Sequence, residues 1–541
     1  MRKKWKLLIV LFVILVAGLY YYIALPAFNI HSTGTWFLII VLLVALAVFY
    51  GARRQIRAGE VRQNKGMRLL IGVILGVGVV YLVGTLLSSP IFNAKKYQQL
   101  MKVEEGNFSE DIQELSFDKI PLLDRDTAVL LGDRKMGSMV EMVSQFEADD
   151  IYSQINYQDN PVRVTPLKYA SLIKWFTNQS EGIPAYIRIN MATQTTELVE
   201  LEEGMKYSTS EHLNRNIYRH LRFAHPTYIY GDLSFEIDDD GIPYWIAPVK
   251  KFNIGLFGGE TVGKVVICNA IDGSMVTYDI EDVPQWVDRA YSADLLVELF
   301  DYYGTLKHGF LNSVLSQKDC LKTTEGYNYL ALEDDVWMYT GVTSVNGDQS
   351  NVGFVLANQR TMETKYYEVE GATETSAMSS AEGQVQNLKY TATFPLLLNI
   401  SGEPTYFIAL KDDAGLVKKY AMVNVQKYQI VAIGDSVSQC QENYLDLMAS
   451  NGIRGEEEGG ADVLSVTGRI TKIAQAVVEG NSHYYVMIEG SDDIFDVSVV
   501  DFIDILRYEV GQEITMEYQE GGTANVVLSL GAGSEEAQVE E

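Results

Sequence analysis

The chain begins with three apolar stretches, and the charges between them indicate how it would cross a membrane. Residues 7–28, 36–51 and 69–87 are each apolar and about long enough to span a bilayer as a helix. The segment between the first two contains no Lys or Arg, whereas the segment between the last two contains six bases and a single acid, Glu60. Cytoplasmic loops collect basic residues. The pattern predicts a multi-pass cell-membrane protein with its N-terminus inside and its large C-terminal part extracytoplasmic.

The part of the chain after the apolar stretches is strongly acidic. The whole chain has 43 Lys and Arg and 71 Asp and Glu, and residues 1–90 contain ten of those bases and one of the acids, so the remainder has a net charge near −37. Such a surface repels nucleic acid, which excludes nucleic-acid binding. It suits a basic protein partner or simple solvation. The consecutive acids Asp238, Asp239 and Asp240 are compatible with weak binding of divalent cations, but they do not follow the alternating pattern of a calcium loop.

The cysteines argue against a disulfide framework. Cys268, Cys320 and Cys440 are odd in number and far apart, so they predict neither paired bridges nor a cysteine metal site. A large outer region without disulfides fits a bacterial envelope better than a eukaryotic secretory compartment. We predict no cofactor and no metal ligands.

The chain is predicted to be α+β, with several parts after the membrane domain. Residues 1–90 form the membrane domain, and residues 91–450 form an extracytoplasmic α+β region. Residues 451–462 are predicted to form a linker, because glycine makes the backbone flexible and like charges repel each other and extend the chain. Residues 463–530 form a small domain. Residues 531–541 are an acidic tail that cannot bury apolar surface, so we expect it to be disordered.

The central region contains an internal repeat. The pattern G-x-P-x-[YW]-[IF] begins at Gly182, Gly241 and Gly402. Glycine and proline fit a turn, and the aromatic and branched residues that follow fit the start of a strand. Strand–turn–strand segments are predicted at 262–279 and 417–435, and helices before the first and third copies at 167–176 and 373–386. The recurring unit is therefore a helix, a strand and an antiparallel hairpin.

With this unit the chain resembles PepSY-type domains, which are small extracytoplasmic modules with a helix against an antiparallel sheet. The resemblance covers residues 241–282 and 402–435, with 182–201 as a weaker third stretch. The later copy departs from the pattern, since residues 426–428 read QKY where residues 271–273 read IDG. The resemblance implies a binding or inhibitory module. It transfers no catalytic residues.

The C-terminal domain resembles a small OB-like β-barrel. Its pattern predicts five short strands with a helix between the third and the fourth. OB-like barrels often bind nucleic acid. Here the bases Arg469, Lys472 and Arg507 are outnumbered by eleven acids between Glu479 and Glu520. A nucleic-acid groove needs the opposite sign. We interpret this domain as a structural or protein-binding module.

Two motifs suggest catalysis at first sight, and both lack their companion elements. Ser171 and Lys174 match the S-x-x-K of serine acyl-enzymes, without the other signature segments of that class. Residues 258–265 approach a phosphate-binding loop, but Val265 stands where a Ser or Thr would bind Mg²⁺, and a strand-like run follows. We predict no catalytic residues.

Glycines on the third apolar stretch form a candidate packing face. Gly72, Gly76 and Gly84 follow a four-residue spacing, with Val80 between them. Such a stripe lets another helix approach closely. The neighbour is one of the chain's own first two helices, a helix of a partner subunit, or the same helix of a second copy of this chain.

A basic island interrupts the acidic region. Residues 208–223 are predicted to form a helix, with Ser208 and Glu211 as a capping box. The candidate patch for an anionic partner or lipid headgroup consists of Arg215, Arg219, His220 and Arg222. The alternative is that these cations neutralise neighbouring carboxylates.

These features together favour a non-catalytic binding, scaffolding or regulatory protein, anchored in the membrane of a bacterial cell envelope and acting on a protein partner. One alternative is an envelope hydrolase or processing enzyme whose catalytic carboxylates are dispersed in sequence. A cleft with two acids of shifted pKa would favour that enzyme. Another alternative is an accessory subunit of a transport or secretion complex.

Overall fold

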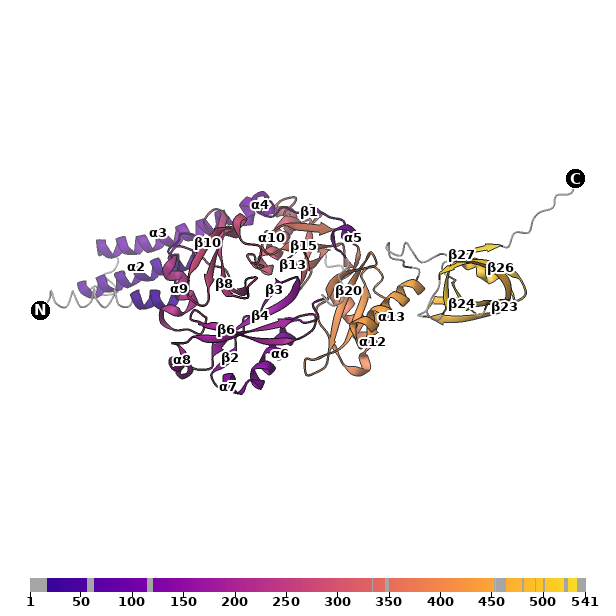
Figure 1. The fold of residues 1–541 in the computed structure, drawn as a ribbon. Coiled ribbons are helices and arrows are strands. Elements are labelled where there is room, and N and C mark those ends of the chain that lie inside the picture. The colour runs from indigo at the N-terminus through magenta and orange to yellow at the C-terminus, as the bar shows by residue number, and fades with distance from the viewer. Residues whose placement is uncertain are drawn as a thin grey trace. The chain divides into compact units, whose positions relative to one another are not determined.

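The protein is a mixed α+β chain that divides into two compact units (Figure 1). The computed structural model describes residues 17–55, 63–113, 120–332, 334–345, 350–451, 453, 464–478, 481–491, 493–499, 502–519 and 524–532. The first unit comprises Met1–Asn107 and Ser116–Glu374, and the second comprises Phe108–Leu115 and Thr375–Glu541. The predicted α+β class is confirmed. The predicted linker, apart from Asn451 and Ile453, and the tail beyond Ala532 lie outside the described residues.

Two helices of the first unit are long and apolar enough to cross a membrane. They are α2 (Thr33–Arg54) and α3 (Lys65–Ser88). Only 6% of the most apolar window of α2 is buried, and none of that of α3. A helix in a soluble core would be mostly buried, so these exposed apolar surfaces are consistent with a lipid environment. Of the predicted stretch 7–28, residues 17–24 are helical and residues 1–16 lie outside the described residues.

The first unit contains three larger antiparallel sheets with short helices around them. The first sheet has the order β2 (Phe146–Ala148), β4 (Asn160–Tyr169), β5 (Ile183–Asn190), β6 (Thr196–Met205), with β3 (Ser153–Tyr157) also on β4. The second has the order β10 (Met275–Asp279), β9 (Gly258–Asn269), β8 (Pro243–Ile254), β7 (Ser234–Ile237). The third has the order β1 (Glu104–Glu105), β16 (Thr364–Tyr367), β15 (Gly353–Asn358), β13 (Asp335–Ser344), β11 (Leu321–Thr323), with β12 (Asn328–Leu332) on β13; its one parallel pair is β1 with β16.

The remaining elements of this unit are short. The helices are α4 (Pro90–Gln98), α6 (Arg125–Ser138), α7 (Val140–Val143), α8 (Leu172–Asn178), η3 (Leu213–Arg215), α9 (Ile217–Ala224), η4 (Ile280–Asp282), α10 (Ala293–Thr305) and α11 (Phe310–Val314). The strands β14 (Ser350–Asn351) and β17 (Gly371–Ala372) pair with each other.

The second sheet is the middle layer of the unit. Along β8, Trp245 and Ala247 belong to a core shared with the first sheet, whereas Ile246 between them belongs to a core shared with α10 and the third sheet. Strand β9 alternates in the same way, with Val266 on the first side and Val265 on the other. Successive strand residues point to opposite faces, so a strand that is apolar at consecutive positions is covered on both sides.

The second unit contains a smaller sheet and a barrel. Its sheet has the order β18 (Thr391–Ala392), β20 (Glu403–Lys411), β21 (Val417–Asn424), β22 (Val431–Gly434), with β19 (Leu396–Ile400) on β20. The helices are α5 (Phe108–Asp111), α12 (Glu374–Gln384), η5 (Gln386–Leu388) and α13 (Val437–Ser450). Tyr444 of α13 is fully buried, and its hydroxyl lies 2.8 Å from Thr405 Oγ1 of β20.

The predicted five strands of the C-terminal domain close into a barrel (Figure 1). The strands are β23 (Leu464–Val478), β24 (Asn481–Ile488), β25 (Phe495–Ser498), β26 (Glu513–Gln519) and β27 (Asn525–Ala532), in the order β23-β24-β25-β27-β26. A 3-10 helix, η6 (Ile503–Arg507), lies between the third and fourth strands, where the sequence predicted a helix. The barrel core includes Val486, Phe495 and Ile514, all fully buried.

The internal repeat corresponds to turns that lead into strands. Gly182, Gly241 and Gly402 have φ values of +85°, +80° and +79°, and strands β5, β8 and β20 begin within two residues of them. Only glycine adopts this region readily, which explains the recurring residue. The predicted hairpins also form, as β9 with β10 and β21 with β22.

Of the two helices predicted in this region, one is confirmed and one is displaced. Helix α12 occupies most of the predicted range 373–386. The prediction of a helix from residue 167 is wrong, because β4 continues to Tyr169, which pairs with Phe146, and α8 begins only at Leu172. The sheet partner, which lies outside the local sequence, overrides the local preference.

The tip of the long β8–β9 hairpin lies against the apolar helices. Ser88 Oγ, at the end of α3, accepts hydrogen bonds from the backbone N–H groups of Leu256 (2.8 Å) and Phe257 (3.2 Å). The ring of Phe257 lies 5.1 Å from that of Tyr81 and 6.2 Å from that of Trp36, measured between centroids. The second sheet of this unit is thus packed directly on the helices through its hairpin tip.

One of the three candidate packing glycines makes this contact. A Cβ placed on Gly84 would lie 2.6 Å from Leu256 Cδ1, so the space above this glycine is filled by the hairpin tip. A Cβ on Gly72 or Gly76 would meet nothing within 4 Å in the described part of the chain. The glycine stripe is therefore covered by the hairpin tip at Gly84 and open at Gly72 and Gly76 in the described part of the chain.

We expect Gly84→Leu to lower the free energy of unfolding by about 1–3 kcal/mol, because the new side chain would overlap Leu256. Denaturant unfolding of the detergent-solubilised full chain measures this change. Gly76→Leu is the matched control, with equal volume added on the same helix into open space. Equal effects of the two substitutions would contradict the assigned packing.

Candidate functional site

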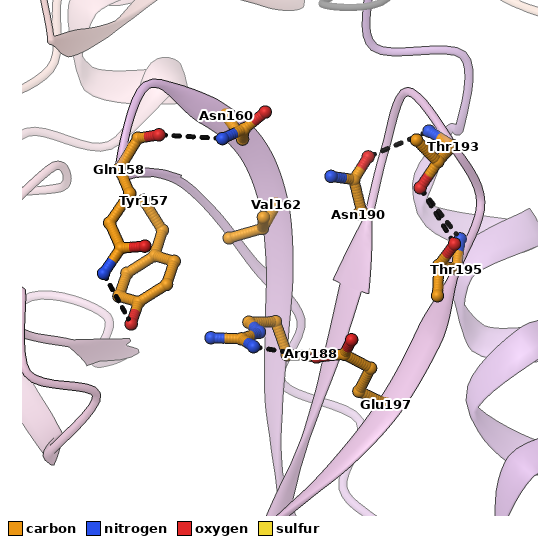
Figure 2. Close-up of a pocket in the computed structure, with 9 residues that line it drawn as sticks. All are labelled: Tyr157, Gln158, Asn160, Val162, Arg188, Asn190, Thr193, Thr195 and Glu197. Atoms are coloured by element: carbon orange, nitrogen blue, oxygen red, sulfur yellow. Dashed lines mark hydrogen bonds and ion pairs between the residues drawn. The ribbon is translucent and has the colours of Figure 1, made fainter.

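A polar pocket lies at one end of the first sheet (Figure 2). Its volume is about 290 Å³. The lining residues come from β3, β4, β5, β6 and the turns between them: Tyr157, Gln158, Asn160, Val162, Arg188, Asn190, Thr193, Thr195 and Glu197. Apart from Val162, every lining side chain has at least one hydrogen-bonding group.

The wall of the pocket is organised around Arg188. Arg188 Nη2 lies 2.7 Å from Glu197 Oε2 on the neighbouring strand, and the Arg188 guanidinium carbon lies 4.9 Å from the centroid of the Tyr157 ring. The Tyr157 hydroxyl accepts a hydrogen bond from Gln158 Nε2 at 3.1 Å. Ion pairing and stacking together hold the guanidinium in a defined position.

Two tight turns form the rim of the pocket. Between β3 and β4, Gln158 and Asp159 have φ values of +52° and +59°, as in the type I′ turns that suit two-residue hairpins. Between β5 and β6, Asn190 Oδ1 accepts from the backbone N–H groups of Ala192 and Thr193. In Figure 2 the amide nitrogen of Asn190 is directed away from Thr193. A non-glycine residue at positive φ costs energy, and such strain often accompanies functional sites.

The chemistry of the lining suits binding. Among the described residues that line the pocket, Glu197 is the only carboxylate, and it is already paired with Arg188. Amides, hydroxyls and a fixed guanidinium provide donors and acceptors for a polar ligand.

The pocket lies at the opposite end of the unit from the apolar helices. The turn before β8 is beside the pocket, since Tyr186 Oη donates to the carbonyl of Gly241 at 3.0 Å and Gln158 Nε2 donates to that of Asp239 at 3.4 Å. Strand β8 then runs from Pro243 to Ile254, next to the hairpin tip on α3. At a rise of ~3.3 Å per residue, this strand separates the two ends by about 36 Å.

The arginines of the predicted basic patch bond to backbone carbonyls. Arg219 Nε donates to the carbonyl of Tyr22, and Arg222 Nε donates to the carbonyl of Leu25, at 3.3 Å and 2.9 Å. Arg219 also stacks on the ring of Tyr22, 4.6 Å from its centroid. The carbonyls at a helix C-terminus have no partner within the helix and carry partial negative charge, so cations stabilise them.

The other two members of the patch also bond to carbonyls. Arg215 Nη1 donates to the carbonyl of Gln179 at 2.6 Å, and His220 Nε2 lies 2.8 Å from the carbonyl oxygen of Gly273. The predicted helix over 208–223 is shorter in the structure. It begins after Asn216, whose side chain accepts from the Arg219 N–H, and the Ser208–Glu211 contact belongs to the preceding turn.

The two catalytic-looking motifs have structural roles. Ser171 is the N-cap of α8, and its Oγ accepts from the Lys174 backbone N–H at 3.4 Å. Residues 258–265 form the first part of β9. Asp238 Oδ1 accepts from the N–H groups of Asp240 and Ile242, which closes the turn before β8. Within the described ranges, no three His, Cys, Asp or Glu side chains are grouped as metal ligands.

The structure brings together two buried carboxyls that the sequence analysis did not single out. Glu236 of β7 is fully buried and Asp288 is 1% exposed. Glu236 Oε2 accepts from the Asp288 backbone N–H at 2.9 Å, and Asp288 Oδ2 accepts from the Asn156 N–H at 2.8 Å. Burial raises the pKa of both groups, and their mutual repulsion adds to the shift at Asp288. They join three segments of the unit in its interior and are not among the lining residues of the pocket.

Neither the pocket nor the buried pair has a local signature in the sequence. The pocket residues lie in four strands and the turns between them, and no fixed spacing along the sequence marks them as one site. The most useful signal was the polar pair Gln158–Asp159 between two strand-like runs, which predicts a hairpin turn but not its surroundings.

Comparison with known proteins does not assign this chain to a family. No family model matches the chain, and no curated protein matches its sequence. A solved structure described as an exo-beta-1,3-galactanase from Bifidobacterium bifidum s17 matches at 8% identity over 54% of this chain and 73% of that chain, with a TM-score of 0.16. A B. megaterium levansucrase mutant matches at 8% identity over 82% and 99%, with a TM-score of 0.17. Scores this low support no statement about the fold or function of this chain.

The buried pair predicts a pH dependence of stability. A carboxyl with a raised pKa in the fold binds its proton more tightly there than in the unfolded chain, so stability falls as pH rises from the ordinary carboxyl pKa of about 4 towards the raised value. Asn imitates the protonated carboxyl. We therefore expect Asp288→Asn to be more stable than the parent by about 1 kcal/mol near pH 7.5 and to lose this advantage near pH 4.

Thermal unfolding of the detergent-solubilised full chain at the two pH values measures this difference. Asp239→Asn, at an exposed turn position, is the matched control and should show no such gap. A variant that is destabilised equally at both pH values would contradict the assignment of a costly buried charge.

Proposed function

We propose that the chain is a membrane-anchored, non-catalytic binding protein of a bacterial cell envelope, which holds a polar pocket on the side of its domain away from the bilayer. The pocket is the observation that carries this proposal. Its lining offers amides, hydroxyls and one fixed guanidinium, with a single paired carboxylate. The length of β8 separates it from the hairpin tip on the apolar helices by about 36 Å.

The ligand class follows from the lining. Arg188 is neutralised by Glu197, so the pocket does not favour a strongly charged ligand. The side chains of Asn190, Thr193 and Thr195 provide groups that hydrogen-bond hydroxyls and amides. We propose a neutral ligand rich in hydroxyl and amide groups.

The orientation of the chain is part of the proposal. Arg53 and Arg54 end α2, and Lys65 and Arg68 lie in the first turn of α3, at the helix ends far from the hairpin tip. Basic residues favour the cytoplasmic side, so the folded units would be extracytoplasmic and the protein multi-pass. The repeated turn–strand–hairpin units act as PepSY-like binding modules, and the barrel acts as an OB-like protein-binding module whose acidic surface excludes nucleic acid.

Binding of chitotriose, a neutral oligosaccharide with hydroxyl and acetamido groups, tests the pocket. Titration calorimetry with the detergent-solubilised full chain should show binding, and Arg188→Met should weaken it by about tenfold or more, because hydrogen bonds from a charged donor contribute about 1.5–3 kcal/mol. Lys168→Met is the matched control, since Lys168 lies in β4 and pairs with Asp150 outside the pocket. Absence of binding, or equal weakening by both substitutions, would reject this ligand class.

External protease tests the orientation. We expect protease added to intact cells without their walls to remove a C-terminal tag, while a cytoplasmic control protein survives. The reason is that the basic segment between α2 and α3 favours the cytoplasmic side, which places the folded units outside. A tag that resists until the membrane is broken would place the acidic units in the cytoplasm and overturn the envelope assignment.

A further inference from the structure

The short helix α8 and the neighbouring turn carry an exposed apolar patch. The patch consists of Leu172, Ile173 and Phe176 of α8 together with Leu213, and their exposed fractions are 63%, 73%, 71% and 64%. Large apolar side chains gathered at such exposure mark an interaction surface. Leu213 also has a φ of +54°, a backbone conformation that costs energy in a residue other than glycine.

Helix α8 is tied to the basic patch. The carbonyl of Gln179, one residue beyond α8, accepts from Arg215, and the ring of Trp175 lies 4.6 Å from that of His212. The Leu213 carbonyl accepts from Arg219 Nη1 at 3.1 Å. Arg219 in turn binds the carbonyl of Tyr22. The apolar patch is therefore continuous with the contact between the folded unit and the first helical segment.

The same contacts give the depth of the patch. Arg222 binds the carbonyl of Leu25. Arg219, three residues before Arg222, binds the carbonyl of Tyr22, which is three residues before Leu25. Helix α9 and the first helical segment thus run in the same direction. Three residues of a helix correspond to a rise of about 4.5 Å. Arg219 donates both to the Leu213 carbonyl and to the Tyr22 carbonyl, so Leu213 lies at about the level of Tyr22. Tyrosines such as Tyr20, Tyr21 and Tyr22 collect where a bilayer meets water.

We propose that the patch inserts into the interfacial region of the same bilayer that the apolar helices cross, with lipid as its occupant. The composition of α8 supports this assignment, since a helix that lies in the membrane surface combines Trp, Phe and Leu with basic residues. Lys174 follows Ile173 directly, and Arg215 lies beside the end of the helix. These cations are placed at headgroup level in an otherwise acidic domain. Insertion would hold the domain at two points and fix its tilt relative to the membrane.

Site-directed fluorescence tests the proposal on the full chain in nanodiscs of phosphatidylcholine and phosphatidylglycerol. Single cysteines replace Phe176, Gln158 or Leu82 and carry the polarity-sensitive probe NBD. The native cysteines are buried, with at most 3% of their surface exposed, and do not compete for labelling. Leu82, 67% exposed on α3, is the lipid-facing reference, and Gln158, in the turn at the opposite end of β4, is the aqueous reference.

The probe at Phe176 is expected to emit at shorter wavelength than the probe at Gln158 and to be quenched by lipids spin-labelled near the headgroup. In the double variant Ile173→Asp, Phe176→Asp, a probe at Leu213 should lose this quenching; both replaced side chains are more than 70% exposed, so folding does not depend on them. A water-like, unquenched probe at Phe176 would overturn the proposal. So would a probe shielded from aqueous iodide yet unaffected by labelled lipid, which would indicate a protein or a second copy. Failure of the Leu82 probe to be quenched would overturn membrane insertion itself, independently of the pocket.

Discussion

The β8–β9 hairpin is the element on which the arrangement of the first unit depends. It is apolar on both faces, with Trp245 directed into one core and Ile246 into the other. A strand of this kind is stable only between two covering layers. The first sheet supplies one layer, and α10 with the third sheet supplies the other. The hairpin is buried on both faces along the middle of β8, and it connects a tip that packs on α3 with an opposite end that lies beside the polar pocket.

The two ends of this hairpin have opposite chemistry. At one end, Phe257 packs with Trp36 and Tyr81, and the arginines of α9 bind carbonyl groups of the first helical segment. At the other end, strained turns bring amides and hydroxyls around Arg188. The two carboxyls of Glu236 and Asp288 lie in the interior, where their desolvation costs stability and leaves no access for a substrate. Anchoring and binding are thus separated along one strand direction, and the buried pair of Glu236 and Asp288 belongs to neither contact.

Several predictions from the sequence depended only on local patterns, and these agree with the structure. The turns at Gly182, Gly241 and Gly402, helix α12, and the five strands of the barrel all follow from backbone preferences and hydrophobic periodicity. Predictions that depended on a distant partner were less accurate. Strand β4 extends over residues read as a helix because Phe146 pairs with Tyr169. The sequence patterns also did not identify the partners of Arg219 and Arg222 within the chain, which are carbonyl groups almost 200 residues earlier. No spacing rule in a sequence contains such a partner.

The sequence by itself determined the apolar helices, the acidic character of the rest and the α+β class, because each of these follows from composition and short-range periodicity. Only the tertiary structure decided which of the three candidate glycines is covered, where the hairpin tip lies, and which polar side chains converge on a pocket. The physical reason is that a strand presents alternate residues to opposite faces without specifying its neighbours. Side chains such as Tyr157, Arg188 and Glu197 become one site only when β3, β4, β5 and β6 are paired in register.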